Sequence, residues 1–358
     1  MTKLKKDKNI IIIISLVILN VFSLISLYSS IYYDFELQNS IFYKQILWFI
    51  ISWILLIVFS FINYRLYYNL TIPLYIFTVL LLSLVDMFGK TAMGSQRWLS
   101  IGGFNLQPSE LSKITTIFIL ARFFSQGKQI NFKKILSVLV LILINAFLIY
   151  KQPDLGSSLL IIFLFFFVGF FSGIKKIYFI ILIIFGLTLL PFGFKNLKEY
   201  QKKRLLVFLN PNIDPLGAGY TIIQSKIAIG SGKIFGKGFL GGTQNQFNFL
   251  PERHTDFIFT VIAEEWGFLG SIFLIFIYYI ILKKILDTSE QLKDLYAKIL
   301  CIGITANIFL DIFINIGMTM GILPVVGIPL LFISYGGSHL VSSFILMGIF
   351  LNIYKQNS

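Results

Sequence analysis

Charge and cysteine are both scarce in this sequence, and each shortage excludes a class of protein. Only 13% of the 358 residues are charged and 57% are hydrophobic, whereas about 25% of the residues of a soluble domain are charged. A chain this apolar cannot cover its own surface in water, so lipid must surround much of it. The single cysteine, Cys301, excludes a disulfide framework and a cysteine-based zinc site. It lies in an apolar run and is predicted to be a buried hydrophobic residue.

Acidic residues are outnumbered by basic ones, 16 against 30, which gives a net charge of +14. In a soluble protein this excess would suggest a nucleic-acid partner. Membrane proteins concentrate Lys and Arg in cytoplasmic loops, which explains the excess without nucleic acid. The only two histidines, His254 and His339, belong to no cluster with metal-ligand spacing. The sequence leaves open a Mg²⁺ or Mn²⁺ ion held by one carboxylate and substrate phosphates.

Long apolar runs dominate the chain and predict its fold. About 20 apolar residues cross a bilayer, and ten such runs occur, at 9–30, 41–62, 68–88, 108–126, 133–150, 155–173, 176–194, 256–282, 295–319 and 329–354. The first is too long for a signal-peptide core and lacks a small-residue cleavage site, so it is predicted to be an anchoring helix. We therefore expect a single all-α, polytopic membrane domain over residues 1–358 with about ten transmembrane helices.

The distribution of Lys and Arg predicts the orientation. An even number of helices places both termini on one side. If that side is cytoplasmic, cations in short inner segments outnumber those in short outer segments by about five to one. Both termini are therefore predicted to be cytoplasmic. The hydrophilic segment 195–255, between the seventh and eighth predicted helices, is then a large extracytoplasmic loop, long enough to escape the rule despite its many cations.

The end of this loop carries the most informative carboxylate. Asp256 follows Arg253 and His254 and precedes the apolar run from Phe257. One interpretation is structural, in which Thr255 or Asp256 caps the next helix. The other is chemical, in which Asp256 accepts a proton at the membrane–water boundary. Both remain open, because a cap also fixes the position of a carboxylate.

Two more carboxylates, Glu264 and Glu265, are predicted to lie roughly 12–14 Å deeper along the same helix. Charge at that depth requires a cavity or a cationic partner, for which Arg97 and Lys113 are candidates. Glu110 and Lys113 are three residues apart and share a helical face, so they can form an ion pair. Such a pair can join helices structurally or take part in catalysis, and both interpretations remain open.

The loop is rich in basic residues, which can contact anionic lipid headgroups or bind a diphosphate substrate. The segment from Gly230 to Gly238 superficially resembles a phosphate-binding loop. It lacks the Walker spacing and a Ser or Thr after its second lysine, and it faces the outside, so no nucleotide cofactor is predicted. Its glycines are expected to allow sharp turns or close backbone approach.

Several motifs, in the same order along the chain, resemble those of the SEDS family (shape, elongation, division and sporulation proteins). They are Arg97-Trp98, Gln107-Pro-Ser-Glu110, Gln152-Pro-Asp-Leu-Gly156, Asn210-Pro-Asn-Ile-Asp-Pro-Leu-Gly-Ala-Gly-Tyr220, Gln224-Ser-Lys-Ile-Ala-Ile-Gly-Ser-Gly232 and Ser334-Tyr-Gly-Gly-Ser338. The segments 242–259 and 324–329 are more similar to the elongation branch, RodA, than to the division branch, FtsW. The resemblance covers nearly the whole chain.

The resemblance implies the SEDS fold in the bacterial cytoplasmic membrane and polymerisation of lipid II into glycan strands on its outer face. It implies a class B penicillin-binding protein as the transpeptidase partner, together with other membrane proteins of the elongation complex. Asp256 matches the family's essential carboxylate, and the family's other positions match Arg97, Trp98, Glu110, Lys113 and Asp154. The expected substrate-binding residues are these five together with four that the charge pattern suggests, namely Arg204, Arg253, His254 and Glu264. His339 departs from the family, which usually has a second serine there.

The residues fit an inverting glycosyl transfer in which Asp256 is the general base and undecaprenyl diphosphate leaves. Arg97, Lys113, Arg204 and Arg253 are the candidate cations for the diphosphate. Two rival hypotheses remain. A lipid II flippase would use intramembrane ionisable residues to line a path for the headgroup. A non-catalytic scaffold of the elongation complex would tolerate the loss of Asp256.

Overall fold

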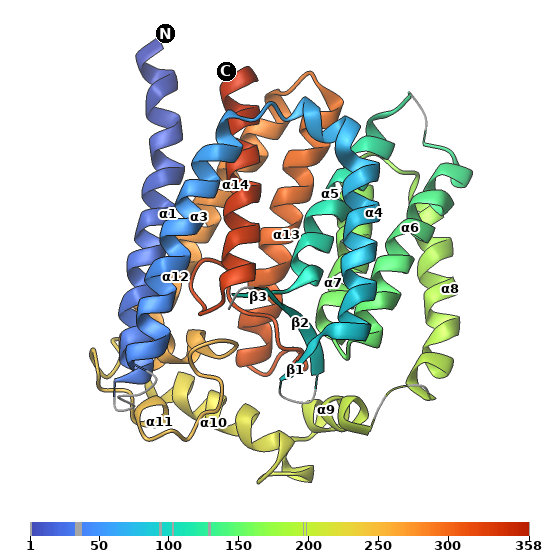
Figure 1. Ribbon diagram of the computed structural model, residues 1–358. Helices are drawn as coiled ribbons and strands as arrows, with labels where there is room; N and C mark the ends of the chain where they lie inside the picture. The colour runs from blue at the N-terminus through green and yellow to red at the C-terminus, as the bar shows by residue number, and fades with distance from the viewer. Residues whose placement is uncertain are drawn as a thin grey trace.

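The structure, a computed structural model, is a bundle of long helices (Figure 1). It describes residues 2–32, 38–92, 95–101, 104–127, 130–195, 197 and 199–357. The long helices are α1 (Thr2–Ile31), α3 (Tyr43–Phe61), α4 (Arg65–Phe88), α5 (Pro108–Ser125), α6 (Phe132–Lys151), α7 (Leu155–Phe171), α8 (Lys176–Lys195), α12 (Ile258–Gln291), α13 (Leu295–Thr319) and α14 (Gly337–Asn357). Seven of these, among the described residues, are long and apolar enough to cross a bilayer: α1, α3, α4, α6, α12, α13 and α14.

The predicted polytopic, all-α membrane fold is confirmed, whereas the count of ten spans stays a prediction. Helices α7 and α8 contain shorter apolar stretches, and α5 is the least apolar of the ten predicted spans. Three boundaries differ from the prediction by seven residues or more. Helix α1 begins at Thr2 rather than 9. Helix α12 continues to Gln291 rather than 282, and α14 begins at Gly337 rather than 329. Residues 329–336 are instead non-helical, with a turn at 331–333, which the apolar character of the segment did not reveal.

Helix α5 lies at the centre of the bundle, and its position explains its composition. It contacts α4, α6, α7, α13 and α14, and nearly every residue from Pro108 to Ala121 is buried. Protein rather than lipid surrounds it, so it can hold ionisable groups that would be costly against hydrocarbon. The outer helices have the opposite pattern, with exposed apolar side chains such as Leu47, Ile50 and Ile54 on α3.

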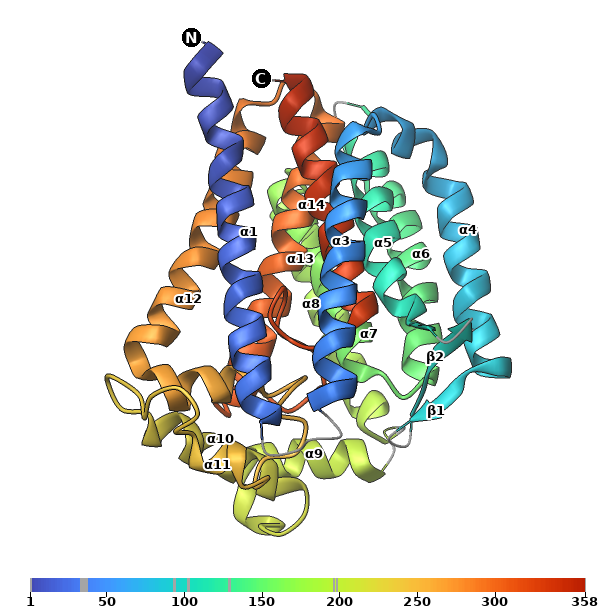
Figure 2. The same cartoon turned by 60° about the vertical axis from the view of Figure 1, so that its left-hand side comes forward.

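The shorter elements gather at one end of the bundle, away from the start of α1 and the end of α14 (Figures 1 and 2). They are the helices α9 (Glu199–Leu209), α10 (Ala218–Ser231) and α11 (Thr243–Gln246), the 3-10 turn η2 (Pro211–Ile213) and the π-helical turn η1 (Gln38–Phe42). A small antiparallel sheet lies at the same end, with β1 (Lys90–Ala92), β2 (Ser95–Ile101) and β3 (Phe104–Leu106) in that order. No pattern in the sequence predicted this sheet.

Helix α12 is broken at Gly267, where φ is +64°. At the break, some backbone amides and carbonyls of α12 have no hydrogen-bond partner within the helix. The loop after α10 supplies the missing partners. The amides of Lys237 and Gly238 donate to the carbonyls of Glu264 and Glu265, at 3.0 and 2.9 Å. In return, the amides of residues 268 and 269 donate to the carbonyls of residues 233 and 234. The glycine-rich segment therefore completes α12, as its predicted close backbone approach requires.

Candidate functional site

A cavity of about 880 Å³ opens at the end of the bundle where the sheet and the short helices lie. Its walls come from α3, β2, α5, the start of α7, α9, the segment before α12 and the segment between α13 and α14. Seven of the residues predicted from sequence line it: Asp256, Arg97, Trp98, Glu110, Lys113, Arg204 and His254. The chain thus brings these residues together from positions far apart in the sequence.

Asp256 lies just before α12 without capping it. The residue that precedes the helix is Phe257, and no side chain caps this terminus. Thr255 instead donates its hydroxyl to a carboxylate oxygen of Glu252, at 2.9 Å. The predicted capping role for Thr255 or Asp256 is therefore wrong, because the helix begins at Ile258, one residue later than a cap by Asp256 would require. The carboxylate of Asp256 remains directed to the cavity.

The backbone around Asp256 is held at three consecutive carbonyl groups. The amide of Tyr335 donates to the carbonyl of His254 at 3.0 Å. The Ser334 hydroxyl donates to the carbonyl of Thr255 at 2.6 Å. The side-chain amide of Asn315, on α13, donates to the carbonyl of Asp256 at 2.8 Å. Sequence reasoning missed both side chains, because their contacts are with the backbone of a distant segment.

The surroundings of Asp256 raise the pKa of its carboxyl group from 3.8 to about 6. Burial is the largest cause, since it disfavours the charged form, and the nearby Glu252 adds repulsion. Arg97 and Arg204 oppose this increase by attraction. A carboxyl group with a pKa near 6 is largely ionised at neutral pH and is still basic enough to accept a proton.

Arg97 is fixed beside Asp256 by the loop before α7. Its Nη2 atom donates to the carbonyl of Pro153 at 2.5 Å, and its Nη1 atom lies 3.9 Å from Oδ1 of Asp154. Asp154 caps α7 by accepting from the amide of Ser157 at 3.1 Å, so it is oriented behind Arg97 rather than in the cavity wall. Strand β2 presents Arg97 and Trp98 to the cavity.

Gly327 allows Asp256 and Arg97 to approach each other. Its backbone has φ of +74°, a conformation that favours glycine. A Cβ atom at this position would lie 3.3 Å from Oδ2 of Asp256 and 4.0 Å from Nη1 of Arg97. A side chain here would fill the space between the carboxylate and the guanidinium group.

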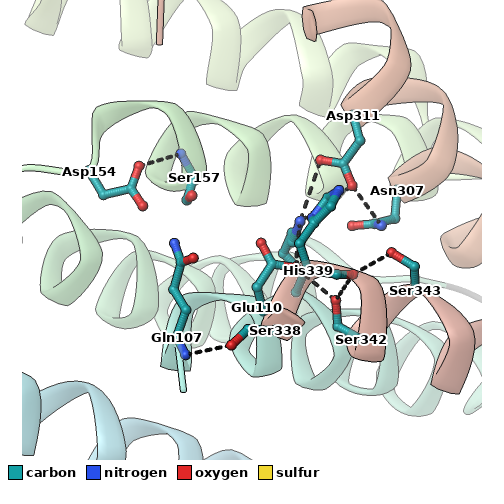
Figure 3. Close-up of polar contacts among 11 residues, drawn as sticks. Gln107, Glu110, Asp154, Ser157, Asn307, Asp311, Ser338, His339, Ser342 and Ser343 are labelled. Carbon is teal, nitrogen blue, oxygen red and sulfur yellow. Dashed lines mark hydrogen bonds and ion pairs between the residues drawn. The ribbon is translucent and has the colours of Figure 1, made fainter. Parts of the chain in front are cut away.

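Deeper in the cavity, Glu110 and Lys113 form the ion pair that their spacing predicts, at 2.9 Å. Lys113 also lies 3.3 Å from a carboxylate oxygen of Asp311 on α13. Figure 3 shows Glu110 and Asp311 on the helices α5 and α13 that Lys113 joins. All three are buried. Lys113 is thus paired with two carboxylates, and the sequence analysis did not identify Asp311 as the second.

His339 joins the same network from the first turn of α14. Its Nδ1 atom lies 3.3 Å from Oε2 of Glu110, and the Ser342 hydroxyl donates to that oxygen at 2.8 Å. Asn307 donates to Asp311 at 3.2 Å (Figure 3). The departure from the family at position 339 therefore places an imidazole directly on a buried carboxylate.

Three predicted substrate-binding residues do not line the cavity, namely Asp154, which caps α7 behind Arg97, together with Arg253 and Glu264. Arg253 is buried, and its Nε atom donates to the carbonyl of Ser30 at the end of α1, at 2.5 Å. Glu264 is fully buried and pairs with Lys237 at 2.7 Å, so its predicted pairing with Arg97 or Lys113 is wrong. Glu265 contacts Ser29 instead of either cation. The segment between α10 and α12 supplies the partners of Glu264, and α1 supplies the side-chain partner of Glu265.

The described residues contain no group of three or more His, Cys, Asp or Glu side chains that could hold a metal ion. A metal bound here would need oxygen atoms from the substrate in addition to protein carboxylates. Asp256 and Glu252 both line the cavity, and Glu252 influences the pKa of Asp256.

The fold and the site define an integral membrane protein whose cavity gathers carboxylates and cations at one end of its helix bundle. The chain belongs to the cell cycle protein family that comprises FtsW, RodA and SpoVE, whose sequence model matches residues 7–358. The predicted membership of the SEDS family is confirmed.

Curated relatives match most of the chain. It is 41% identical over 305 residues to the peptidoglycan glycosyltransferase MrdB of Escherichia coli, which covers 85% of this chain and 82% of the relative. The peptidoglycan glycosyltransferase RodA of Treponema pallidum is 32% identical to this chain, and the match covers 87% of this chain and 88% of that relative. The probable peptidoglycan glycosyltransferase FtsW of Trichlorobacter lovleyi is 36% identical, with 82% and 77% covered.

Solved structures match the fold over nearly the whole chain. One of them superposes with a TM-score of 0.83 at 27% identity, and the match covers 97% of both chains. This structure describes the structural coordination of polymerization and crosslinking by a peptidoglycan synthase complex. The rod shape determining protein RodA of Thermus thermophilus superposes with a TM-score of 0.72, covering 97% of this chain and 96% of its own. At 24% identity, the second match bears on the fold alone.

Proposed function

We propose that this chain is a peptidoglycan glycosyltransferase that polymerises lipid II during cell elongation and maintenance of cell shape. The observation that carries the proposal is Asp256, a carboxyl group with a pKa of about 6 in a cavity that it shares with Arg97 and Arg204. Relatives that match most of the chain are named peptidoglycan glycosyltransferases, which supports the same activity here.

The reaction is a single displacement with inversion. Asp256 takes the proton of the acceptor's 4-hydroxyl group as that oxygen attacks the anomeric carbon of the donor sugar. The new carbon–oxygen bond forms while the bond to the diphosphate breaks, and undecaprenyl diphosphate leaves with the electron pair. The leaving group is already a stable anion, so no second carboxyl group is required to protonate it, in contrast to a glycosidase. The broken diphosphate ester supplies the energy, which explains how polymerisation proceeds without a nucleotide.

Arg97 and Arg204 are placed to stabilise the charge that develops on the diphosphate. Lys113 is already paired with Glu110 and Asp311. We therefore propose that it stabilises the wall of the cavity and does not neutralise the diphosphate directly. A divalent cation, Mg²⁺ or Mn²⁺, held by Asp256 or Glu252 and the substrate phosphates, would add Lewis-acid stabilisation of the leaving group.

We place the active site on the outer face of the bacterial cytoplasmic membrane, with both termini in the cytoplasm. The cavity lies at the end of the bundle opposite the start of α1 and the end of α14. The distribution of Lys and Arg along the sequence predicts that the end of the bundle with both termini faces the cytoplasm. The exposed apolar face of α3 beside the cavity, with Leu47 in its wall, gives the lipid tail of a substrate a route from the bilayer.

The partner is proposed to be a class B penicillin-binding protein that crosslinks the new strands, within the elongation complex and its other membrane proteins. A matching solved structure comes from a peptidoglycan synthase complex that coordinates polymerization with crosslinking. The chain is similar to that protein over 97% of its length, which supports an equivalent assembly.

The test is polymerisation of labelled lipid II by the purified chain with its class B partner, whose transpeptidase is blocked. Polymer from wild type but not from Asp256→Asn supports the transferase and its base together. Polymer from both proteins would support the transferase activity and would contradict the role of Asp256 as its base. If neither folded protein makes polymer, transbilayer movement of labelled lipid II separates a flippase from a non-catalytic scaffold.

A further inference from the structure

A second, smaller cavity of about 230 Å³ also reaches Asp256. Three ionisable residues line both cavities, namely Arg204, Glu252 and Asp256. The remaining walls of the small cavity include Val207 of α9 and Ile222 of α10. Asp256 therefore stands at the junction of two spaces that differ about fourfold in volume.

The two cavities differ in what they can hold. Pockets for whole small-molecule ligands measure about 300–1,000 Å³, so the large cavity is within this range and the small one is below it. The large cavity has several cations and the apolar face of α3 on its wall, which suit a lipid-linked diphosphate. The small cavity combines the buried side chains of Val207, Ile222 and Phe257 with the hydroxyl of Thr221 and the carboxylate of Glu252. One sugar ring, with apolar faces and hydroxyl edges, matches this lining.

Glu252 is held in place at the boundary between the cavities. Its backbone adopts φ of +53°, which is unusual for a residue with a side chain. Its carbonyl accepts from the amides of Thr255 at 3.1 Å and Phe257 at 3.2 Å. Its carboxylate accepts from the Thr255 hydroxyl at 2.9 Å. These bonds fix an acceptor for a sugar hydroxyl within the same tight turn that carries Asp256.

An inverting displacement requires two spaces around its base. The attacking oxygen must approach the anomeric carbon from the side opposite the departing diphosphate. The base contacts the attacking hydroxyl, so it belongs where the acceptor sugar meets the donor. Asp256 has this position if the diphosphate of the donor lies among the cations of the large cavity and the acceptor ring lies in the small one.

We propose that the small cavity is the subsite for the terminal N-acetylhexosamine ring of the acceptor, which it holds with the 4-hydroxyl group on Asp256. The inference rests on the proposed function and specifies where one of its two substrates binds. Val207, Ile222 and Phe257 pack against the face of the ring, and Thr221 and Glu252 bind its hydroxyl groups. The donor occupies the large cavity.

The test separates donor from acceptor kinetically. Labelled lipid II that lacks the 4-hydroxyl group on its terminal sugar serves only as the donor, and unlabelled lipid II serves as the acceptor. Val207→Trp fills the small cavity. Leu206→Trp is the matched control, because the neighbouring Leu206 is 47% exposed and lines neither cavity. The rate of coupling is measured while each substrate is varied in turn.

We expect Val207→Trp to raise the KM for the acceptor at least tenfold while the KM for the donor stays within about twofold of wild type. Leu206→Trp should match wild type for both substrates. An unchanged acceptor KM in Val207→Trp, or an equal rise for donor and acceptor, would overturn the subsite while the enzyme stands. If wild type couples no donor at all, the proposed function itself fails, and the subsite with it.

Thr221→Val decides the question if Val207→Trp does not fold. This substitution keeps the volume of the side chain and removes its hydroxyl group, so it should raise the acceptor KM several-fold and leave the donor KM unchanged. Thr188→Val, at an exposed position on α8, is the control. An acceptor KM equal to that of wild type in Thr221→Val, with the protein folded, would contradict a sugar contact in the small cavity.

Discussion

Asp256 and Glu264 are carboxylates eight residues apart on one segment, yet their surroundings are opposite. Glu264 is fully buried and accepts from Asn245 at 2.5 Å, from Lys237 at 2.7 Å and from the amide of Gln244 at 3.0 Å. Asp256 faces two cavities, and it is the backbone around it, rather than its carboxylate, that the bundle holds.

The difference shows how the same functional group serves either structure or chemistry. Glu264 has its charge satisfied by a full set of donors, and it ties the loop after α10 to α12. Asp256 has its carboxyl pKa raised by burial and by Glu252, which leaves it able to accept a proton. The number of donors that converge on a carboxylate, rather than its depth in the membrane, separates the two roles.

The largest expected effect is the loss of activity in Asp256→Asn. An amide cannot accept the acceptor's proton, so polymerisation of lipid II should fall by about 10²- to 10⁴-fold. The side chain keeps its shape, so the thermal unfolding temperature should stay close to that of wild type. Activity within tenfold of wild type in the folded variant would remove Asp256 as the base and, with it, the contrast with Glu264.

A smaller effect is expected from Asn315→Ala, which removes the donor to the carbonyl of Asp256. We expect a roughly tenfold loss in kcat with little change in KM, because the base is displaced while the binding surfaces remain. Thr305→Val is the matched control: Thr305 is also buried on α13, but its hydroxyl donates only within the helix. A change confined to stability in Asn315→Ala would show that the contact has no part in positioning.

The pH profile offers a third test. Asp256 must be deprotonated to act as a base, so kcat/KM should rise about tenfold per pH unit up to pH 6 and level off above it. Glu252→Gln removes a like charge that raises the pKa of Asp256, so the midpoint should move to lower pH. Glu290→Gln, at an exposed position near the far end of α12, should leave the midpoint unchanged. A midpoint that Glu252→Gln does not move would contradict the coupling of the two carboxylates.

The smallest effect on activity is expected from Glu264→Gln, although this variant should be the least stable of the four. It weakens charge-assisted hydrogen bonds in a buried site, which should lower the free energy of unfolding by about 1.5–3 kcal/mol. Polymerisation per folded molecule should stay near wild type. Thermal unfolding and specific activity should be measured in both variants. Glu264→Gln should lose stability and keep its activity, whereas Asp256→Asn should keep its stability and lose its activity. A loss of specific activity in Glu264→Gln like that of Asp256→Asn would end the distinction.

The sequence predicted the helices and part of the site because those features depend on local patterns. Apolar runs define the spans, and Glu110 pairs with Lys113 because three residues of helix place them on one face. Asp311 was missed because it lies 198 residues from Lys113. The partner of Glu264 was misassigned for a similar reason, since Lys237 approaches only after the loop turns back onto α12. Long-range contacts of this kind leave no periodicity in the sequence.

The remaining errors concern short segments rather than helices. The sheet that presents Arg97 was missed because its strands have only three to seven residues. Arg253 was assigned to the substrate as a cation close to Asp256 in the sequence, but the tight turn directs the side chains of Arg253 and His254 to different places. His254 lines the cavity, and Arg253 contacts the end of α1. The side chains of neighbouring residues in a turn point in different directions, and the sequence alone does not reveal which direction each takes.

The break in α12 at Gly267 has a consequence for the stability of this span. A Cβ atom at Gly267 would lie 2.3 Å from the backbone nitrogen of Gly236, so the close approach of the two segments requires glycine at this position. Lipid offers no hydrogen bonds to an open stretch of helix. Helix α12 therefore depends on the preceding loop, whose backbone completes the hydrogen bonds at the break. The stability of this span is set partly by a segment outside it, so a substitution that displaces the loop should destabilise the helix as well.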